Sequence, residues 1–96
     1  MITGKTTSGF EFSIDAAAMD DMRLIDTMAV ILSPGASRSD ILAANSRGAE
    51  ILLGLVQKEA LYEHIGKQHD GRVPIAVFAQ ELKEIMAAPG KDAEKN

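Results

Sequence analysis

The residues that could do chemistry are few in this chain, and their spacing does not bring them together. His64 and His69 stand five residues apart, which on a helix separates their directions by about 140°, whereas two ligands of one metal ion usually stand at i and i+4. The chain has no cysteine and no HExxH motif, so a zinc site is not expected. We therefore predict neither a metal ion nor any other cofactor.

The turn at Asp70 and Gly71 resembles a calcium-binding loop only at these two positions. In that register Gly66 and Gln68 would occupy the first and third ligand positions, where the cation needs carboxylate oxygens. The sequence also lacks a GxSxG nucleophile elbow and a glycine-rich phosphate loop. These patterns predict a protein that is not an enzyme.

The composition is that of one small globular domain, with 96 residues, 46% hydrophobic and 25% charged. A net charge of -4 disfavours nucleic-acid binding, because that affinity comes mainly from basic residues that neutralise phosphates. No basic segment followed by an apolar run begins the sequence, and no window approaches the ~20 apolar residues that span a bilayer. We expect a soluble cytoplasmic protein that binds neither nucleic acid nor a membrane.

The N-terminal residues have the pattern of a β-hairpin. Phe10, Phe12 and Ile14 alternate with polar residues, which is typical of a strand with one apolar face. The dipeptide Ser8-Gly9 is a turn signal, so residues 2–7 can pair back as the other strand. Two strands alone are marginally stable, so we expect the hairpin to lie on helices.

Helical patterns fill the rest of the chain. Asp15 is a good N-cap for a helix over residues 16–32, which Pro34 would end. Residues 37–53 form either one helix or two short ones, because their centre is weak helix-forming sequence, and Gly54 is the expected break after them.

Residues 50–86 have the pattern of two amphipathic helices joined by a turn. The first would cover about residues 55–67, and Asp70-Gly71 is a strong turn dipeptide. Pro74 fits the first position of the last helix, which we expect to end near Ala87, before a second proline and glycine. The sequence thus predicts a mainly α (α+β) fold: an N-terminal hairpin and four to five amphipathic helices in one domain over residues 1–88, with a mobile polar tail over residues 89–96.

The helix expected over residues 16–32 has two apolar stripes. One consists of Ala18, Met22, Ile25, Ala29 and Leu32, and the other of Leu24, Met28 and Ile31. Together they cover an arc near 180°, wider than the roughly 100° with which a helix usually meets one core. Either the helix is central and packs on both sides, or one stripe faces the core and the other a partner. We expect Leu24, Met28 and Ile31 to bind the partner, with Tyr62 and Phe78 as further partner-binding residues.

Asp21 and Lys58 each fall within an apolar arc of their own helix. A carboxylate buried alone is costly, so Asp21 should stay at the rim of its arc or meet a cation. Lys58 could be that cation, or it could extend its stem along apolar surface and keep its amine in water. We expect structural roles for both, as for Asp15, Asp70, Gly71 and Pro74.

In order, the segments SGFEFSID, MDDMRLIDTMA, LLGLVQKEALYEHI and HDGRVPIAVFAQELKEIM resemble the small tail assembly chaperones of long-tailed bacteriophages and prophages. The similarity covers about residues 7–88, and its most specific parts are Asp21-Met22-Arg23, the run from Gln57 to Tyr62 and the run from Asp70 to Pro74. Residues 33–48 depart from the family pattern, so no binding role is transferred to them.

The resemblance implies a helper protein that binds the long, largely helical tape measure protein before tail tube subunits polymerise around it. Such a protein acts in the cytoplasm of the bacterial host and is not expected in the mature virion. The family often makes a second, longer form by ribosomal frameshifting, and we expect this chain to self-associate as well. The alternative interpretation is a generic helical adaptor or regulatory protein-binding domain, also non-enzymatic.

Overall fold

The computed structural model describes residues 1–94, and the side chains through Pro89. An antiparallel hairpin of β1 (Ile2–Lys5) and β2 (Glu11–Ile14) is followed by the 3-10 helix η1 (Ala16–Asp20). Three α-helices come next: α1 (Met22–Leu32), α2 (Arg38–Gln68) and α3 (Ile75–Glu94). The predicted hairpin and mainly helical architecture are confirmed, but the described chain has three α-helices instead of four to five.

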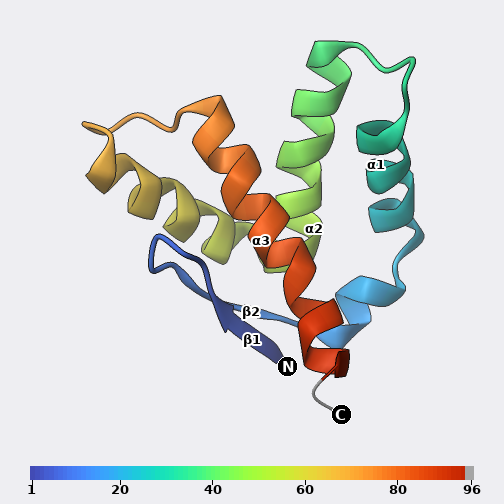
Figure 1. The fold of residues 1–96 in the computed structure, drawn as a ribbon, viewed down its shortest axis with the longest axis horizontal. Coiled ribbons are helices and arrows are strands. Elements are labelled where there is room, and N and C mark those ends of the chain that lie inside the picture. Colours follow the sequence, from blue (N-terminus) through green and yellow to red (C-terminus); the bar gives the residue numbers. More distant parts are fainter. Residues whose placement is uncertain (95–96) are drawn as a thin grey trace.

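The hairpin lies against α3 and the C-terminal half of α2, on the opposite side of the molecule from α1 (Figure 1). Ile2 pairs with Ile14, and Phe12 and Ile14 turn their side chains into the core. The side-chain amide of Gln57 pairs with the free edge of β2: Oε1 accepts from the Ser13 backbone N and Nε2 donates to the Ser13 carbonyl, both at 2.8 Å. The hairpin is therefore attached to α2 by polar as well as apolar contacts.

The helix expected over residues 16–32 is divided at Asp21, which has extended backbone angles. Asp15 caps η1, accepting from the Ala17 backbone N at 3.0 Å, as its N-cap role predicted. Asp21 does the same for α1, accepting from the Arg23 N at 2.9 Å. Aspartate competes with helical backbone bonding through such local hydrogen bonds, which explains a new helix start at this position.

The N-terminal half of α2 is one continuous helix, so residues 37–53 do not form the two short helices that the sequence left possible. Its weak helix former Gly48 is buried, and a Cβ there would lie 3.4 Å from the Thr27 Cγ2, in contact with α1. Gly54 has φ 80° and ψ 165°, a conformation open almost only to glycine, and it kinks α2. The predicted break at Gly54 is thus present as a kink within one element.

The turn before α3 forms where predicted. Asp70 and Gly71 both have positive φ, and the Gly71 N donates to the Gly66 carbonyl at 2.8 Å. Pro74 directly precedes α3 and its carbonyl accepts from the Phe78 N at 3.0 Å. The predicted end of this helix near Ala87 is wrong.

α3 continues through Pro89 to Glu94. Proline deletes one backbone hydrogen bond but adopts helical φ, so a helix can go on beyond it. Of the predicted mobile tail, Lys95 and Asn96 lie outside the described residues.

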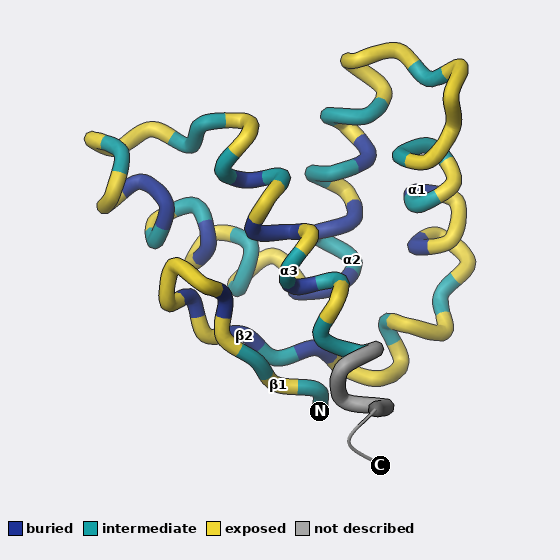
Figure 2. Tube along the Cα trace, viewed as in Figure 1, coloured by how far each residue is buried: buried dark blue, intermediate teal, exposed yellow. Residues whose placement is uncertain are grey.

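One apolar core lies where the hairpin, the kinked part of α2 and α3 meet, as the buried stretches in Figure 2 show. Its buried members are Phe10, Phe12, Ile14, Leu24, Ala49, Leu52, Leu53, Leu61, Ile65, Phe78, Leu82 and Ile85. Leu24 is the contribution of α1 to this buried cluster, so α1 lies at the edge of the core. None of the helices in the described part of the chain combines the length and apolarity needed to cross a membrane.

Candidate partner-binding surface

The two apolar stripes of the first helix have different environments. Leu24 is only 1% exposed and lies in the core, whereas Met22 is 68% and Leu32 76% exposed. α1 is therefore not a central helix packed on both sides, and one stripe does face outward. Of the stripe expected to bind a partner, Leu24 was assigned wrongly, because it is buried and offers no surface, whereas Met28 and Ile31 are half-buried.

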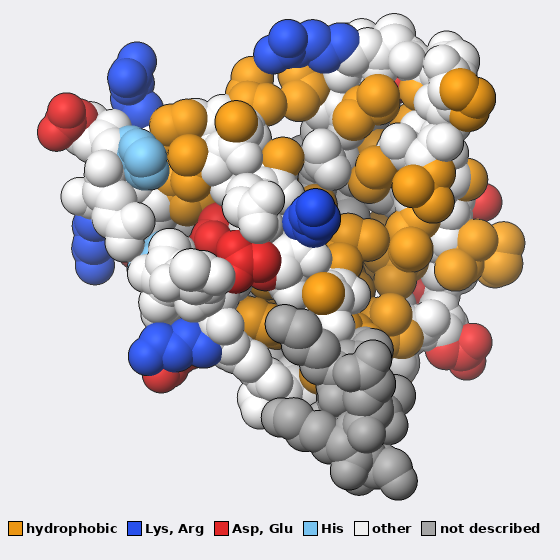
Figure 3. Space-filling model, viewed as in Figure 1, with side chains coloured by type: hydrophobic (Ala, Val, Ile, Leu, Met, Phe, Trp, Pro, Cys, Tyr) orange, Lys and Arg blue, Asp and Glu red, His pale blue; other side chains and the backbone are white. Residues whose placement is uncertain are grey.

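A groove opens between α1 and α3, both of which pack on α2. Its volume is about 450 Å³, and its lining is almost wholly apolar apart from Asn45 and Lys83. The lining residues of this α1–α3 groove are Met28, Ile31 and Leu32 from α1, Asn45 from α2, and Ala79, Leu82, Lys83 and Met86 from α3. Figure 3 shows hydrophobic side chains gathered on this face between α3 and α1.

A second apolar groove of about 350 Å³, called here the Tyr62 groove, shares Asn45 with the first, so the two adjoin. It is lined by Leu42, Asn45, Ser46, Tyr62, Val73, Ile75 and Phe78. The rings of Tyr62 and Phe78 lie 5.5 Å apart between centroids and are tilted, which is a favourable aromatic arrangement. Four of the five predicted partner-binding residues, Met28, Ile31, Tyr62 and Phe78, thus line two adjoining grooves.

Lys58 joins the two halves of α2 across the kink. Its Nζ donates to the Ser46 Oγ at 2.9 Å and lies 5.9 Å from the centroid of the Tyr62 ring. The structural role predicted for Lys58 therefore involves Ser46 and Tyr62, and the pair considered between Lys58 and Asp21 is absent.

Asp21 instead pairs with Arg23, whose Nη2 lies 2.7 Å from the Asp21 Oδ2. Hydrogen bonds from the Arg23 side chain and backbone lower the pKa of Asp21 from 3.8 to about 2. The same side-chain hydrogen bond raises the pKa of the Arg23 guanidinium. This local pair fastens the start of α1.

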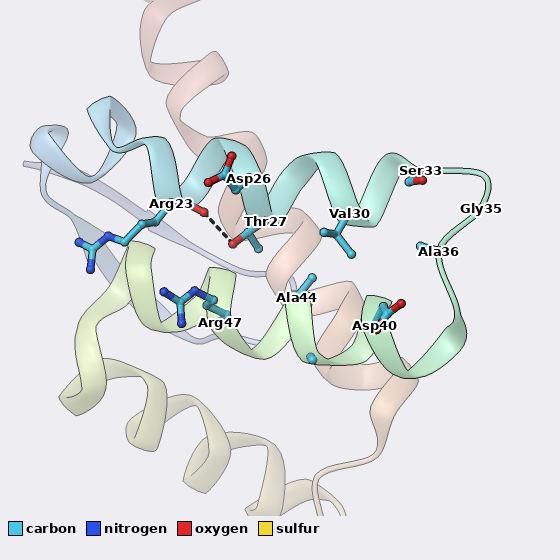
Figure 4. A pocket seen from close by; sticks show the side chains of 11 residues that line it. Arg23, Asp26, Thr27, Val30, Ser33, Gly35, Ala36, Asp40, Ala44 and Arg47 are labelled. Atoms are coloured by element: carbon cyan, nitrogen blue, oxygen red, sulfur yellow. Dashed lines mark hydrogen bonds between the residues drawn. The ribbon is translucent and has the colours of Figure 1, made fainter.

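A third groove, of about 650 Å³, lies between α1 and α2 and differs in its charges (Figure 4). Arg23 and Arg47 lie towards one end and Asp40 towards the other, over an apolar floor that includes Val30 and Ala44. Within the described residues neither Arg47 nor Asp40 forms an ion pair. The opposite charges are spread along the groove and do not converge on one point, so this groove is a weaker candidate for a site.

A buried polar network on the hairpin side of α3 was not predicted. The Glu81 side chain is 3% exposed, and its Oε1 accepts from the Thr6 Oγ1 at 2.9 Å and from the Ser8 Oγ at 2.7 Å. His64 is half-buried, with its Nε2 2.9 Å from the Ser8 Oγ and its ring beside Phe10. The burial of Glu81 could have been inferred from the sequence, because Glu81 lies on the same helical face as Phe78 and Ile85.

The Ser8–His64 contact does not have the geometry of an activated nucleophile. Because the Ser8 hydroxyl donates its proton to Glu81, His64 must donate to the Ser8 oxygen and cannot accept its proton. Nearby, the Thr7 N and Oγ1 both donate to the Glu84 Oε1 at 2.7 Å. The network therefore fastens the hairpin turn to α2 and α3. In the part of the chain that the structure describes, no group of three or more His, Asp or Glu side chains is placed to hold a metal ion.

Comparison of this chain with models of protein families, with curated proteins and with solved structures gives no match. Its function must therefore be inferred from the two apolar grooves and from the resemblance in sequence.

Proposed function

We propose that this protein is a phage tail assembly chaperone that binds the tape measure protein and keeps it soluble while the tail tube polymerises. The observation that carries the proposal is the adjoining pair of apolar grooves, which holds four of the five residues expected to bind a partner. The order and spacing of the sequence segments that resemble this family support it. Under this proposal the protein acts in the cytoplasm of the bacterial host and is absent from the mature virion.

The grooves have the chemistry that such a client requires. A long helical protein without its tube exposes apolar ridges that would otherwise aggregate, and an apolar groove covers such a ridge. Met28 and Met86 leave the α1–α3 groove adaptable, because an unbranched thioether repacks easily against different shapes. The net charge of -4 helps to keep the complex in solution.

Two further partners belong to the proposal. Met22 and Ile25 of α1 are exposed and line neither apolar groove, so they are available for a second copy of the chain. A longer form of the protein, made by frameshifting near the end of the gene, would have the same sequence before the shift and would present the same grooves.

The second candidate function is a generic helical adaptor or regulatory domain that binds another protein. The same grooves would serve it, and only the identity of the client differs. A neighbouring gene for a long helical protein favours the chaperone, whereas its absence favours the adaptor.

Co-expression with the tape measure protein of the same gene cluster tests the proposal. Wild-type protein should keep the tape measure protein in the soluble fraction after centrifugation. Leu32→Asp and Ile75→Asp together should abolish this effect, because each introduces a carboxylate at an exposed rim of one groove without disturbing the core.

Val56→Asp is the matched control, since Val56 is 85% exposed and lines neither groove. It should behave as wild type. If wild-type protein leaves the tape measure protein insoluble, the proposed function is wrong. If the double variant works as well as wild type while both fold, the grooves are not the binding surface.

A further inference from the structure

We propose that the α1–α3 groove receives an amphipathic helix of the partner that carries an acidic residue beside its apolar ridge, where Lys83 pairs with it. Asn45 at the floor would hydrogen-bond to one polar side chain within that ridge. This inference rests on the proposed function and deepens it, because it states which segments of the tape measure protein can bind.

The walls of the groove favour a helix over an extended segment. They are formed by side chains of α1, α2 and α3, whose backbone N–H groups at the groove are bonded within their own helices. An extended segment laid there would bury N–H and C=O groups with no strand edge to pair them. A helix satisfies its own backbone groups and presents only side chains to the apolar walls.

Lys83 makes the groove favour a partner helix with an acidic residue over one with a basic residue. It lies on the lining of an otherwise apolar groove, is exposed, and has no carboxylate within 4.0 Å among the described residues. A docked helix would remove water around Lys83, which strengthens attraction to an acidic residue and disfavours a basic one. Lys83 is the charged residue in the lining of this groove, so a carboxylate on the partner is favoured beside it. The position of that carboxylate then fixes the register of the helix.

Asn45 sets a second requirement for the partner helix. Its side chain is half-buried between the two apolar grooves and makes no hydrogen bond within the described part of the chain. A docked partner would complete its burial, and a buried amide without a partner destabilises the complex. The bound ridge should therefore contain a hydroxyl or amide side chain opposite Asn45, one that a wholly apolar helix lacks.

Overlapping synthetic peptides that cover the helical segments of the tape measure protein provide the probe, with affinity measured by fluorescence anisotropy. Binding should concentrate in peptides with a Glu or Asp beside the apolar ridge. Lys83→Glu should weaken the best of them about fivefold, and this difference should shrink as salt is added. Changing the peptide's acidic residue to Lys should restore binding to the Lys83→Glu protein while weakening binding to wild type. Asn45→Leu should weaken binding about tenfold.

Lys67→Glu is the control, because Lys67 is an exposed helical lysine outside both grooves. It should bind the peptides as wild type does. If Lys83→Glu also binds as wild type, or the charge exchange restores nothing, this inference is wrong even when full-length tape measure protein still binds. If wild-type protein binds no tape measure protein at all, the proposed function fails and the inference fails with it. Occupation of the groove by a second copy would also overturn it, and would be seen as a dimer that Leu32→Asp dissociates, Met22→Asp leaves intact and the peptides cannot displace.

Discussion

The two sides of α3 are built differently. On the hairpin side, Glu81 is buried and its carboxylate is satisfied by two hydroxyls from the hairpin turn. On the α1 side, Lys83 lines an open groove, and neither it nor Asn45 has a polar partner in the described chain. The polar groups on the first side are hydrogen-bonded within the protein, as in a rigid scaffold. The second side leaves apolar surface, Lys83 and Asn45 available to another molecule.

The kink at Gly54 divides α2 into two halves, and both regions draw residues from each half. Before it, the N-terminal half carries Leu42 and Asn45, which line the grooves. After it, the C-terminal half carries Leu61 and Ile65, which are fully buried in the core. Leu52 and Leu53 before the kink are also buried in the core, and Tyr62 after it lines the Tyr62 groove, so each half of α2 contributes to both the scaffold and the grooves.

The largest expected effect comes from two consecutive residues of α3, one in the core and one on the groove. Ile85 is 0% exposed, so Ile85→Ala should leave a cavity and lower the free energy of unfolding by about 3 kcal/mol. Met86 is half-buried on the groove, so Met86→Ala should cost only about 1 kcal/mol and should weaken tape measure binding. Urea unfolding with the same assay for both variants measures the difference. Equal losses of stability would mean that the groove side is as much a part of the core as the hairpin side.

A smaller loss is expected from the polar network. Glu81→Ala should lower the free energy of unfolding by about 2 kcal/mol, because the buried Thr6 hydroxyl loses its acceptor. Glu81→Gln keeps one acceptor oxygen and should lose less. Thermal unfolding followed by circular dichroism compares them with Glu59→Gln, a change at an exposed position. Stability unchanged in Glu81→Ala would show that the network does not hold the hairpin.

Local signals predicted the scaffold well. The alternation of Phe10, Phe12 and Ile14, the cap at Asp15 and the turn at Asp70 and Gly71 each depend on residues close in sequence, and each is found. The end of α3 was predicted wrongly because a proline was expected to stop the helix. Pro89 removes one backbone hydrogen bond and adds a local clash, and the helix continues through both.

The grooves and the network could be predicted only in part, because they depend on how distant segments pack. A helical wheel shows two apolar stripes on α1 but does not say which one meets α2, so Leu24 was assigned to the wrong side. Glu81 needed hydroxyls more than seventy residues away, which no local pattern reveals. Asp21 and Lys58 likewise found nearer partners than each other, in Arg23 and Ser46.

The smallest effect concerns the start of α1, which carries one wall of the groove. The pKa of Asp21 is lowered from 3.8 to about 2 by its hydrogen bonds with Arg23, so the ionised carboxylate stabilises the folded state above about pH 4. That stabilisation should be lost as the pH falls from about 4 to about 2. Asp21→Asn retains an N-cap side chain and removes only the charge, so its stability should depend less on pH across this range.

Unfolding midpoints in urea between pH 2 and pH 6 test this prediction, with Asp26→Asn as the control on an exposed position of the same helix. Wild type and Asp26→Asn should both lose stability relative to Asp21→Asn as the pH falls. Parallel curves for all three would mean that the pair between Asp21 and Arg23 adds nothing to folding. Packing of Leu24, Thr27 and Met28 would then be what holds α1, and with it the groove wall, in place.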